Sequence, residues 1–598
     1  MKIAYLFLLA LLAGCGDTSS DETRELPIET TTQVPAEQPI ETIKPGEAII
    51  KILPEILTVD RNVEQITLYK KLELTLTINA QYDNHYDQRE ALLNAIFTAP
   101  DGSTMLVPGY WDKEWKVRFT PSQIGKWSYT LTMKDTMGTS KPNVGSFDVL
   151  SSDDPGWLQV GSQFDPTYSS RYLVHHDGTP FYGIGHGDVF SVFSRASQVE
   201  RLLGSMQQAK ENYFVWWPQF YFSLIRDNYD DYNLLNGDLI DSVLERTERE
   251  GLFMVFTLWD HSQLRDTSHD WSDGNWWRNG FRHLVDADSF FTDDEAWQWQ
   301  ENWYRYIIGR WGYSPSIAMW QTVSEINGTN AYENSNEWHQ KIHQYFSDND
   351  PYNHPTTASM AGDLNWVEGH NVMDLPQVHI YEDLQPNNSV LTINSAKVIA
   401  SYTQDMWQNN NKPNWIGEFG VINNTSDDST NYYPELFHNA IWSALGAGAA
   451  LTPAEWNDFD NWGVMTAAME QHLTYFSDFI SPLPMAAWDP IQLVISSKNS
   501  TIRGWGIAGK DGGLVWVQDH TLEGLDIVSI RANRAVRKNV SVDIAGLTSG
   551  QYKIVPYNTW QGVFGESYTI DCSPMTNGLC TIALPDFTSD MAFKLERI

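Results

Sequence analysis

Two glutamates, Glu325 and Glu418, follow apolar segments that are typical of buried β-strands. Glu325 comes directly after the stretch 317–324, and Glu418 comes directly after the stretch 413–417. An ionisable carboxyl in such surroundings is costly unless it is paired, hydrogen-bonded or functional. Two of them at strand ends predict that two strands converge and bring both carboxyls to one site. A pair of this kind can act as acid/base and nucleophile on a glycosidic bond.

The segments that must position this pair alternate between strand patterns and helix patterns over residues 153–484. Eight runs are typical of strands: 181–185, 213–217, 252–258, 317–323, 356–359, 377–381, 414–417 and 449–452. Helical periodicity lies between them, at 199–206, 239–248 and 296–308. This alternation predicts a (β/α)8 TIM barrel, whose active site lies at the C-terminal ends of the strands.

Alternating apolar and polar residues, with polar turns between them, flank this region on both sides. Before it, residues 51–152 predict an N-terminal β-sandwich, and the segment 119–129 resembles the sandwich domain that precedes the catalytic barrel in many bacterial carbohydrate enzymes. After it, residues 485–598 predict a second small β-sandwich that braces the barrel or binds glycan. The predicted fold class is therefore multidomain, α/β plus all-β, with a central TIM barrel between two sandwiches.

Glu325 ends the fourth predicted strand and Glu418 ends the seventh. In this respect the chain resembles the retaining glycoside hydrolases of clan A, in which the strand-four glutamate is the acid/base and the strand-seven glutamate is the nucleophile. The resemblance implies these roles for Glu325 and Glu418. The clan usually has Asn before the strand-four acid, where it bonds the sugar 2-hydroxyl, whereas this chain has Ser324. Recognition of that hydroxyl is therefore expected to differ.

Other polar and aromatic residues at predicted strand ends are candidates for binding substrate, and each could equally be structural. Tyr381 resembles the clan's tyrosine that hydrogen-bonds the nucleophile, and Trp456 resembles its tryptophan beneath the cleaved sugar. The remaining candidates are Ser324, His379, Trp259, Asp260, His261 and His186.

Metal and cofactor chemistry are not expected. Asp260, His261, His269 and Asp270 match no compact set of metal ligands. The chain also lacks a Gly-x-Ser-x-Gly nucleophile elbow, a phosphate loop and a dinucleotide-binding fingerprint. We therefore expect no metal and no cofactor.

The N-terminal residues predict export and a lipid anchor. A short apolar run follows Lys2 and ends at Cys15, and it is typical of a signal peptide rather than a membrane span. The stretch 12–15 resembles the bacterial lipobox, which implies cleavage after residue 14 and lipidation of Cys15. Residues 15–50 are acidic, rich in Thr, Pro and Glu, and predict a disordered tether. The expected location is the outer membrane, the cell surface or the periplasmic face.

Two further cysteines, Cys572 and Cys580, flank a segment with Pro574 and Gly578 that bends the chain back. In an exported protein such a pair predicts a disulfide across a hairpin loop.

The net charge and the amino-acid composition limit which kinds of molecule the protein is expected to bind. A formal net charge of −37 argues against nucleic acid, because phosphate binding depends on Lys and Arg. The 26 Trp residues serve aromatic cores, and some could be platforms for sugar rings. The expected partners are therefore a polysaccharide or oligosaccharide substrate and a membrane reached through the lipid, while the oligomeric state is not predicted.

The sequence thus predicts a retaining glycosidase for a β-linked glycan, with a marine galactan of agar or carrageenan type as one candidate. Two alternatives stay open. A non-catalytic glycan-binding lipoprotein would keep the aromatic residues and dispense with the carboxylate pair. A polysaccharide lyase would use a Tyr, His or Lys base on an acidic sugar.

Overall fold

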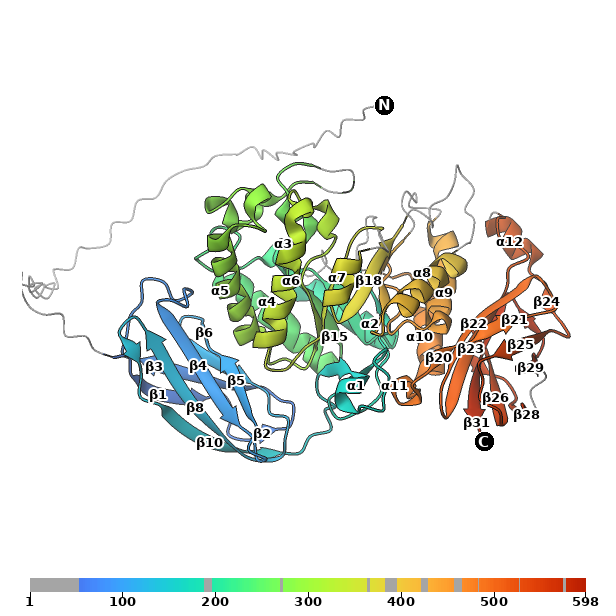
Figure 1. Ribbon diagram of the computed structural model, residues 1–598, viewed down its shortest axis with the longest axis horizontal. Coiled ribbons are helices and arrows are strands. Elements are labelled where there is room, and N and C mark those ends of the chain that lie inside the picture. The colour runs from blue at the N-terminus through green and yellow to red at the C-terminus, as the bar shows by residue number, and fades with distance from the viewer. Residues whose placement is uncertain are drawn as a thin grey trace, which may run out of the picture. The chain divides into compact units, whose positions relative to one another are not determined.

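The structure is a computed structural model (Figure 1). It describes residues 53–187, 196–268, 271, 273–362, 366–381, 395–420, 429–456, 465–481, 483–525, 527–573 and 577–598. The predicted signal peptide, Cys15 and the tether lie outside these residues, as do His269 and Asp270. No helix in the described part of the chain combines the length and the apolar character needed to cross a membrane.

The N-terminal region consists of two β-sheets that share one core. Its strands are β1 (Ile56–Arg61), β2 (Ile66–Thr67), β3 (Leu72–Ile78), β4 (Ala91–Thr98), β5 (Thr104–Pro108), β6 (Tyr110–Trp111), β7 (Trp115–Phe119), β8 (Gly125–Asp135), β9 (Gly138–Thr139) and β10 (Asn143–Leu150). One sheet has the order β1-β3-β7-β6 and the other β2-β10-β8-β4-β5, with β9 paired to β8. In β3 buried and less buried residues alternate, as a strand with one covered face requires. The rings of Phe97 and Phe119 stack at 3.8 Å between the two sheets.

The middle region begins with the antiparallel pair β11 (Leu158–Val160) and β12 (Leu173–His175) and the short helix α1 (Gly161–Phe164). It then builds a seven-stranded parallel sheet whose strands follow chain order. These strands are β13 (Gly185–His186), β14 (Tyr213–Trp216), β15 (Phe253–Thr257), β16 (Ile317–Gln321), β17 (Thr356–Ala358), β18 (Leu375–Ile380) and β19 (Trp415–Phe419). Every residue of β14, β15, β16, β18 and β19 is buried, because both faces of the sheet are covered.

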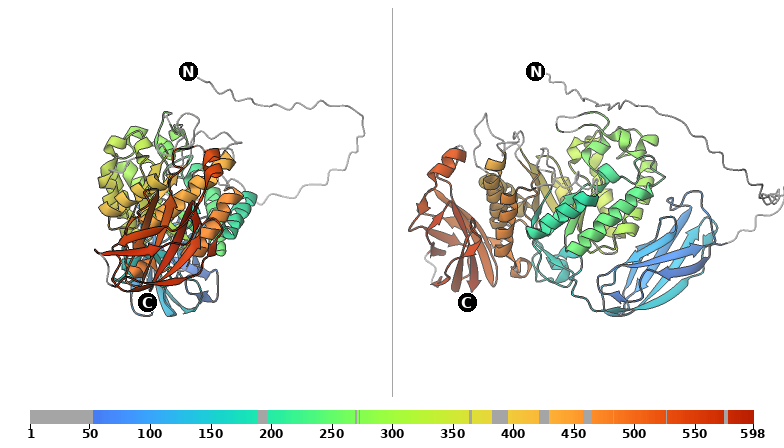
Figure 2. Two further views of the ribbon diagram at one scale, coloured as in Figure 1. Left: turned by 90° about the vertical axis from the view of Figure 1, so that its right-hand side faces the viewer. Right: turned by 180° about the vertical axis from the view of Figure 1, so that it is seen from behind.

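Helices fill the connections between these strands and also follow the last strand, β19. They are α2 (Ala196–Gln208), α3 (Pro218–Phe222), α4 (Leu234–Glu250), α5 (Asp294–Trp311), α6 (Ser335–Asn349), α7 (Val367–Val372), α8 (Ser395–Asn409), α9 (Ser429–Ala447), α10 (Ala467–Ile480) and α11 (Met485–Trp488). Short 3-10 turns add η2 (His261–Leu264), η3 (Trp276–Arg278), η4 (Gly280–His283), η5 (Ala287–Ser289), η6 (Ile326–Gly328) and η7 (Tyr332–Asn334). Figure 1 shows α4, α5 and α6 outside the strands. The right-hand view of Figure 2, seen from behind, shows further green helices on the face turned away from the viewer in Figure 1.

The eighth predicted strand, 449–452, is not a regular strand. Leu451 forms an isolated parallel bridge with Gly183, and Glu455 forms another with Phe419 of β19. Backbone bonds accompany both bridges, from Thr452 N to Gly183 O at 2.8 Å and from Ala454 N to Ile416 O at 2.9 Å. Residues 449–456 thus connect the two edges of the sheet by single bridges, and the closed eight-stranded sheet that we predicted is not present as such. The first strand also differs, because β13 covers only Gly185–His186, at the end of the predicted run 181–185.

The C-terminal region is a second, largely antiparallel β structure. Its elements are β20 (Ile491–Gln492), β21 (Val494–Ser496), β22 (Ile502–Ala508), β23 (Gly512–Asp519), α12 (Ile527–Asn533), β24 (Val536–Arg537), β25 (Ser541–Ala545), β26 (Gln551–Asn558), β27 (Val563–Phe564), β28 (Tyr568–Asp571), β29 (Leu579–Ala583), β30 (Phe587–Thr588) and β31 (Asp590–Arg597). The main sheet runs β20-β22-β23-β31-β26-β27, and a smaller one runs β21-β25-β29. Asp590 accepts hydrogen bonds from Trp516 Nε1 at 3.0 Å and from His438 of α9 at 2.9 Å.

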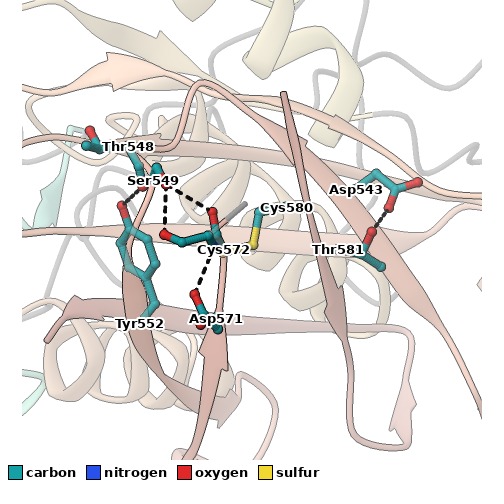
Figure 3. Close-up of a disulfide and its surroundings, with 9 residues drawn as sticks. Asp543, Thr548, Ser549, Tyr552, Asp571, Cys572, Cys580 and Thr581 are labelled. Atoms are coloured by element: carbon teal, nitrogen blue, oxygen red, sulfur yellow. Dashed lines mark hydrogen bonds between the residues drawn. A yellow bond between two sulfur atoms is a disulfide. The ribbon is translucent and has the colours of Figure 1, made fainter. Parts of the chain in front are cut away.

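Cys572 and Cys580 form the predicted disulfide, and both are buried (Figure 3). The bond joins the end of β28 to β29. Beside it, Thr581 Oγ1 donates to Asp543 Oδ1 at 2.5 Å across the β25–β29 pair. The disulfide therefore links the smaller sheet to the main sheet of this region.

Candidate active site

Glu418 lies within β19 and is 5% exposed. The Tyr381 hydroxyl, one residue beyond β18, donates to Glu418 Oε2 at 2.7 Å. Gly417 permits the adjacent packing, because a Cβ there would lie 1.5 Å from Gln377 Oε1 and 3.3 Å from His379 Nε2. A glycine before the glutamate is therefore what allows two polar side chains of β18 to lie against β19.

Glu325 does not close β16, as predicted, but lies beyond its last residue, Gln321. Its backbone is left-handed, with φ of 55°, which is uncommon for a residue with a side chain. The amide of Glu325 donates to Ser359 Oγ at 2.9 Å, and its carbonyl accepts from Gly328 N at 2.8 Å. These two bonds hold a strained conformation that directs the carboxyl, which is 5% exposed.

His379 of β18 lies between the two glutamates. Its Nδ1 is 2.7 Å from Glu325 Oε1 and 3.2 Å from Glu418 Oε2. Because an ionised carboxylate only accepts hydrogen bonds, the proton lies on Nδ1 and is shared between the two oxygens. One oxygen of each carboxyl and one nitrogen of His379 lie within 4.8 Å of one another, a set that could also hold a metal ion. The distance between the two carboxyl oxygens is therefore shorter than the roughly 6.5–9.5 Å between carboxyl groups that leaves room for a water in inverting glycosidases.

The pKa values in this cluster depend on burial and on the shared proton. Burial raises the pKa of Glu418, and the charge of His379 only partly offsets it. Burial acts in the same direction on Glu325, but the hydrogen bond and charge of His379 outweigh it and lower the pKa of Glu325. Burial would lower the pKa of His379, yet the charges and hydrogen bonds of the two glutamates raise it to about 9. The resting protein therefore favours an ionised Glu325 beside an imidazolium, and the three groups titrate together.

A stability measurement can check the raised pKa of His379. A folded pKa of about 9, above the ordinary 6.5, means that the proton stabilises the folded state fully below pH 6.5. This contribution is lost as the pH rises toward 9 and beyond. We expect the free energy of unfolding of the wild type to fall over this window by more than that of His379→Gln, measured in urea at several pH values. Parallel curves for the two proteins would contradict the assignment.

Ser324 and Asp260 lie side by side where the sequence departs from the clan. They form an isolated parallel bridge, and Ser324 N donates to Trp259 O at 2.9 Å. Asp260 Oδ1 accepts from the amides of Ser262 and Gln263, which fixes the start of η2. Asp260 Oδ2 and Ser324 Oγ are buried and have no hydrogen-bond partner in the described chain. Burial raises the pKa of Asp260 to about 6.

His261 and Trp271 bring further groups to Glu325. His261 Nδ1 is 3.5 Å from Glu325 Oε2, and burial lowers the pKa of His261 to about 4. The Trp271 side chain hydrogen-bonds Glu325, and its ring centroid is 6.3 Å from that of His261. Of the predicted substrate-binding residues, the structure thus brings His379, Tyr381, His261, Ser324 and Asp260 to the surroundings of the two glutamates.

Two other predicted residues lie near the edges of the parallel sheet. Trp456 is buried, and its ring lies 5.1 Å from that of Trp217, while Gly187 lies close against it. His186 of β13 is also buried, and its Nδ1 is 2.6 Å from Glu211 Oε2. His186 is therefore engaged by a carboxylate of its own.

Trp259, also predicted to bind substrate, packs against the helix layer in the structure. It is 1% exposed, its Nε1 donates to the Tyr304 hydroxyl at 3.0 Å, and its ring lies 4.5 Å from Trp303 of α5. With its only donor satisfied on the helix side, the indole has no polar group left for a sugar.

Sequence reasoning missed Ser359, Trp271 and Arg265, although all three act on Glu325. Ser359 Oγ accepts a hydrogen bond from the backbone amide of Glu325. The Trp271 side chain hydrogen-bonds the Glu325 carboxyl, and the charge of Arg265 interacts with that carboxyl. The segment 271–277 carries three tryptophans in a polar loop, which is a signal that could have identified Trp271. No local pattern marks Ser359, whose partner is 34 positions away.

Comparisons with known proteins agree with this architecture. The family model named Domain of unknown function (DUF5060) matches residues 65–134, within the N-terminal β region. No curated protein matches the chain. Among solved structures, a Bacteroides vulgatus protein described as a "putative glycoside hydrolase" is 13% identical, with a TM-score of 0.63 over 90% of this chain and 100% of that one. At this identity the likeness shows a shared fold.

Two other solved structures, named as glycosidases, are less similar. The endo-1,4-beta-mannanase of Rhizomucor miehei is 15% identical with a TM-score of 0.39, covering 54% of this chain and 99% of that one. The β-glucuronidase of Bifidobacterium dentium is 12% identical with a TM-score of 0.35, covering 68% of this chain and 61% of that one. The chain is similar in fold to the Bacteroides vulgatus protein described as a "putative glycoside hydrolase", and its residues 65–134 match a domain family of unknown function.

Proposed function

We propose that the protein is a retaining glycoside hydrolase of a β-linked glycan, with Glu325 as acid/base and Glu418 as nucleophile. The observation that carries this proposal is the close pair of buried carboxyls bridged by His379, with Tyr381 donating to Glu418. Residues 449–456 would occupy the position of the eighth strand of a (β/α)8 barrel, because they form bridges to both edges of the sheet.

The charge distribution of the resting cluster must change before the first step, since Glu325 has to carry a proton. The hydrogen bond of 2.7 Å from His379 Nδ1 to Glu325 Oε1 supplies a path. Transfer of that proton leaves a neutral His379, a protonated Glu325 and an ionised Glu418, so the total charge is unchanged. Glu418 then loses one hydrogen bond, keeps that of Tyr381, and becomes the better nucleophile.

The first displacement follows from this state. Glu418 attacks the anomeric carbon while Glu325 gives its proton to the departing oxygen, and a glycosyl ester forms on Glu418. Glu325, now ionised, removes a proton from water, which attacks the ester and restores both carboxyls. The product keeps the configuration of the bond that was cleaved.

Hydrolysis of a panel of plant and algal polysaccharides, agar and carrageenan included, tests the proposal. Products would be sized, and the anomer released first would be identified by NMR in the opening minutes. Release of the β-anomer supports double displacement, and release of the α-anomer overturns it. Ultraviolet-absorbing unsaturated uronates would instead identify a lyase. Binding of a glycan without any cleavage would favour the non-catalytic alternative, to which Ser324 points.

We also propose that the protein is an exported lipoprotein, on the basis of the lipobox-like stretch that ends at Cys15. Expressed in a Gram-negative host, the wild type is expected in the detergent-extracted membrane fraction. Cys15→Ser is expected in the soluble fraction, because the lipidated thiol is missing. Equal distribution of the two proteins would contradict lipidation.

A further inference from the structure

Arg265 is a buried cation whose guanidinium has no hydrogen-bond acceptor among the described residues. It follows η2 directly, is 2% exposed, and has a backbone carbonyl that accepts from Trp276 N at 2.8 Å. None of its three guanidinium nitrogens has a hydrogen-bond partner in the described chain. Leaving so many buried donors unpaired is costly, so an acceptor is expected to come from outside the protein.

Other buried arginines of this chain are fully engaged. Arg118, which is 5% exposed, bonds Glu73 at 2.7 Å and Asp241 at 2.9 Å. Arg310, with no exposure, bonds Asp238 at 2.8 Å and Asp241 at 2.9 Å. In a chain with 76 acidic residues, a carboxylate partner for Arg265 would be easy to supply. Its lack of one therefore needs a functional explanation.

The surroundings of Arg265 belong to the acid/base side of the candidate site. Its Cζ lies 5.9 Å from the ring centroid of Trp271, the residue that hydrogen-bonds Glu325. Trp271 is 43% exposed, so its ring lies against the guanidinium and also faces solvent. The charges of Glu325, Asp260 and Asp273 act on Arg265 without a direct hydrogen bond to its guanidinium. The cation is thus balanced at a distance and remains available for a closer anion.

We propose that Arg265 binds an anionic substituent, a carboxylate or a sulfate, on the sugar at the leaving-group side of the scissile bond. This inference rests on the proposed function, because Glu325 identifies the leaving-group side of the site only if it is the general acid. The sugar packs on Trp271, whose ring turns to admit the anion to the guanidinium fork. A planar guanidinium matches both kinds of anion with two parallel hydrogen bonds.

The net charge of the protein makes such a local cation necessary for an acidic glycan. With a formal charge of −37, the surface repels a polyanion at long range. Solvent screens that repulsion beyond about 8 Å at physiological ionic strength, whereas a buried contact is screened much less. Protonation of Glu325 before the first step also removes one of the negative charges that act on Arg265.

The test compares matched pairs of substrates. One pair is κ-carrageenan oligosaccharides and their desulfated forms, and the other is glucuronate-containing xylan oligosaccharides and their carboxyl-reduced forms. For the wild type we expect a higher kcat/KM on the charged member of the pair that is cleaved, and the pair identifies the anion. For Arg265→Gln we expect the charged-to-neutral ratio of kcat/KM to fall by about 10- to 100-fold, as the loss of charge-assisted hydrogen bonds implies.

Two further variants keep the test sharp. Arg265→Lys retains the positive charge but lacks the planar guanidinium, and it is expected to give an intermediate charged-to-neutral ratio of kcat/KM. If thermal unfolding shows that Arg265→Gln is not folded, Arg265→Lys takes its place in the test. Arg278→Gln removes a charge from the same loop, at an arginine that lies 4.7 Å over the exposed ring of Trp277. Its ratio is expected to stay within about threefold of the wild type.

The possible failures are distinguishable. Equal losses on both members of a pair, or a wild type without preference for the charged member, would overturn the role of Arg265 and leave the glycosidase proposal standing. Cleavage of neutral β-glycosides alone would have the same meaning. A wild type that cleaves no glycoside at all would refute the proposed function itself.

Discussion

Replacement of Glu418 by glutamine is expected to lower kcat by roughly 10⁴- to 10⁶-fold, the scale seen when a covalent nucleophile is removed. The amide has nearly the shape of the carboxyl and can still accept the Tyr381 hydrogen bond of 2.7 Å. It cannot form the glycosyl ester, so the double displacement has no first step. The measurement is initial hydrolysis rate on the best substrate of the panel, with substrate binding by the same variant measured calorimetrically.

Glu435→Gln is the matched control. Glu435 is another buried glutamate, 5% exposed, but it pairs with Arg531 at 2.7 Å and with Arg534 at 3.0 Å. Its replacement should lower the melting temperature and leave kcat within about tenfold, because breaking a buried pair costs stability. If Glu418→Gln retained a tenth of wild-type activity, Glu418 would not be the nucleophile.

Replacement of Glu325 by alanine is expected to lower kcat/KM on a glycan by roughly 10²- to 10⁴-fold, the usual contribution of a general acid. An aryl glycoside with an acidic phenol needs no protonation of its leaving group. On that substrate the first step should therefore proceed at nearly the wild-type rate, and the glycosyl ester on Glu418 should accumulate, because no base activates water. A burst of phenol followed by a slow steady state is the expected time course.

Added azide separates the two roles. In Glu325→Ala it attacks the ester without needing a base and should release a β-glycosyl azide at a restored rate. In Glu418→Ala it would replace the nucleophile and give the α-glycosyl azide. The opposite pairing of products would exchange the two assignments, which is a real question here because the resting cluster lowers the pKa of Glu325 and raises that of Glu418.

The sequence predicted much of the scaffold because its patterns are local. Buried strands such as β15 and β16 carry largely apolar runs, and α5 shows a clear helical period after its N-terminal capping residue, Asp293, whose side chain accepts from Ala296 N at 2.8 Å. The eighth strand failed because pairing at 449–456 depends on both sheet edges, which no local pattern encodes.

In the candidate site, too, some features could be predicted from the sequence and others could not. Glu325 and Glu418 could be paired by counting strands, and His379 and Tyr381 could be placed beside them. The direction of the Trp259 side chain could not be predicted, since an aromatic residue after a strand can face the helix layer or the strand ends. Nor could the unpaired guanidinium of Arg265 be predicted, since it depends on which described side chains come within reach of it in three dimensions.

The left-handed backbone of Glu325 has a consequence for how such a protein can change over generations. At a φ of 55°, glycine is relaxed and asparagine is tolerated, whereas a glutamate there costs of order 1–3 kcal/mol. A protein that only held glycans would need no acid here and would gain stability if glycine replaced this residue. Glu325→Gly is therefore the substitution expected to relieve this strain, whereas the proposed acid/base role requires that the strained glutamate be kept.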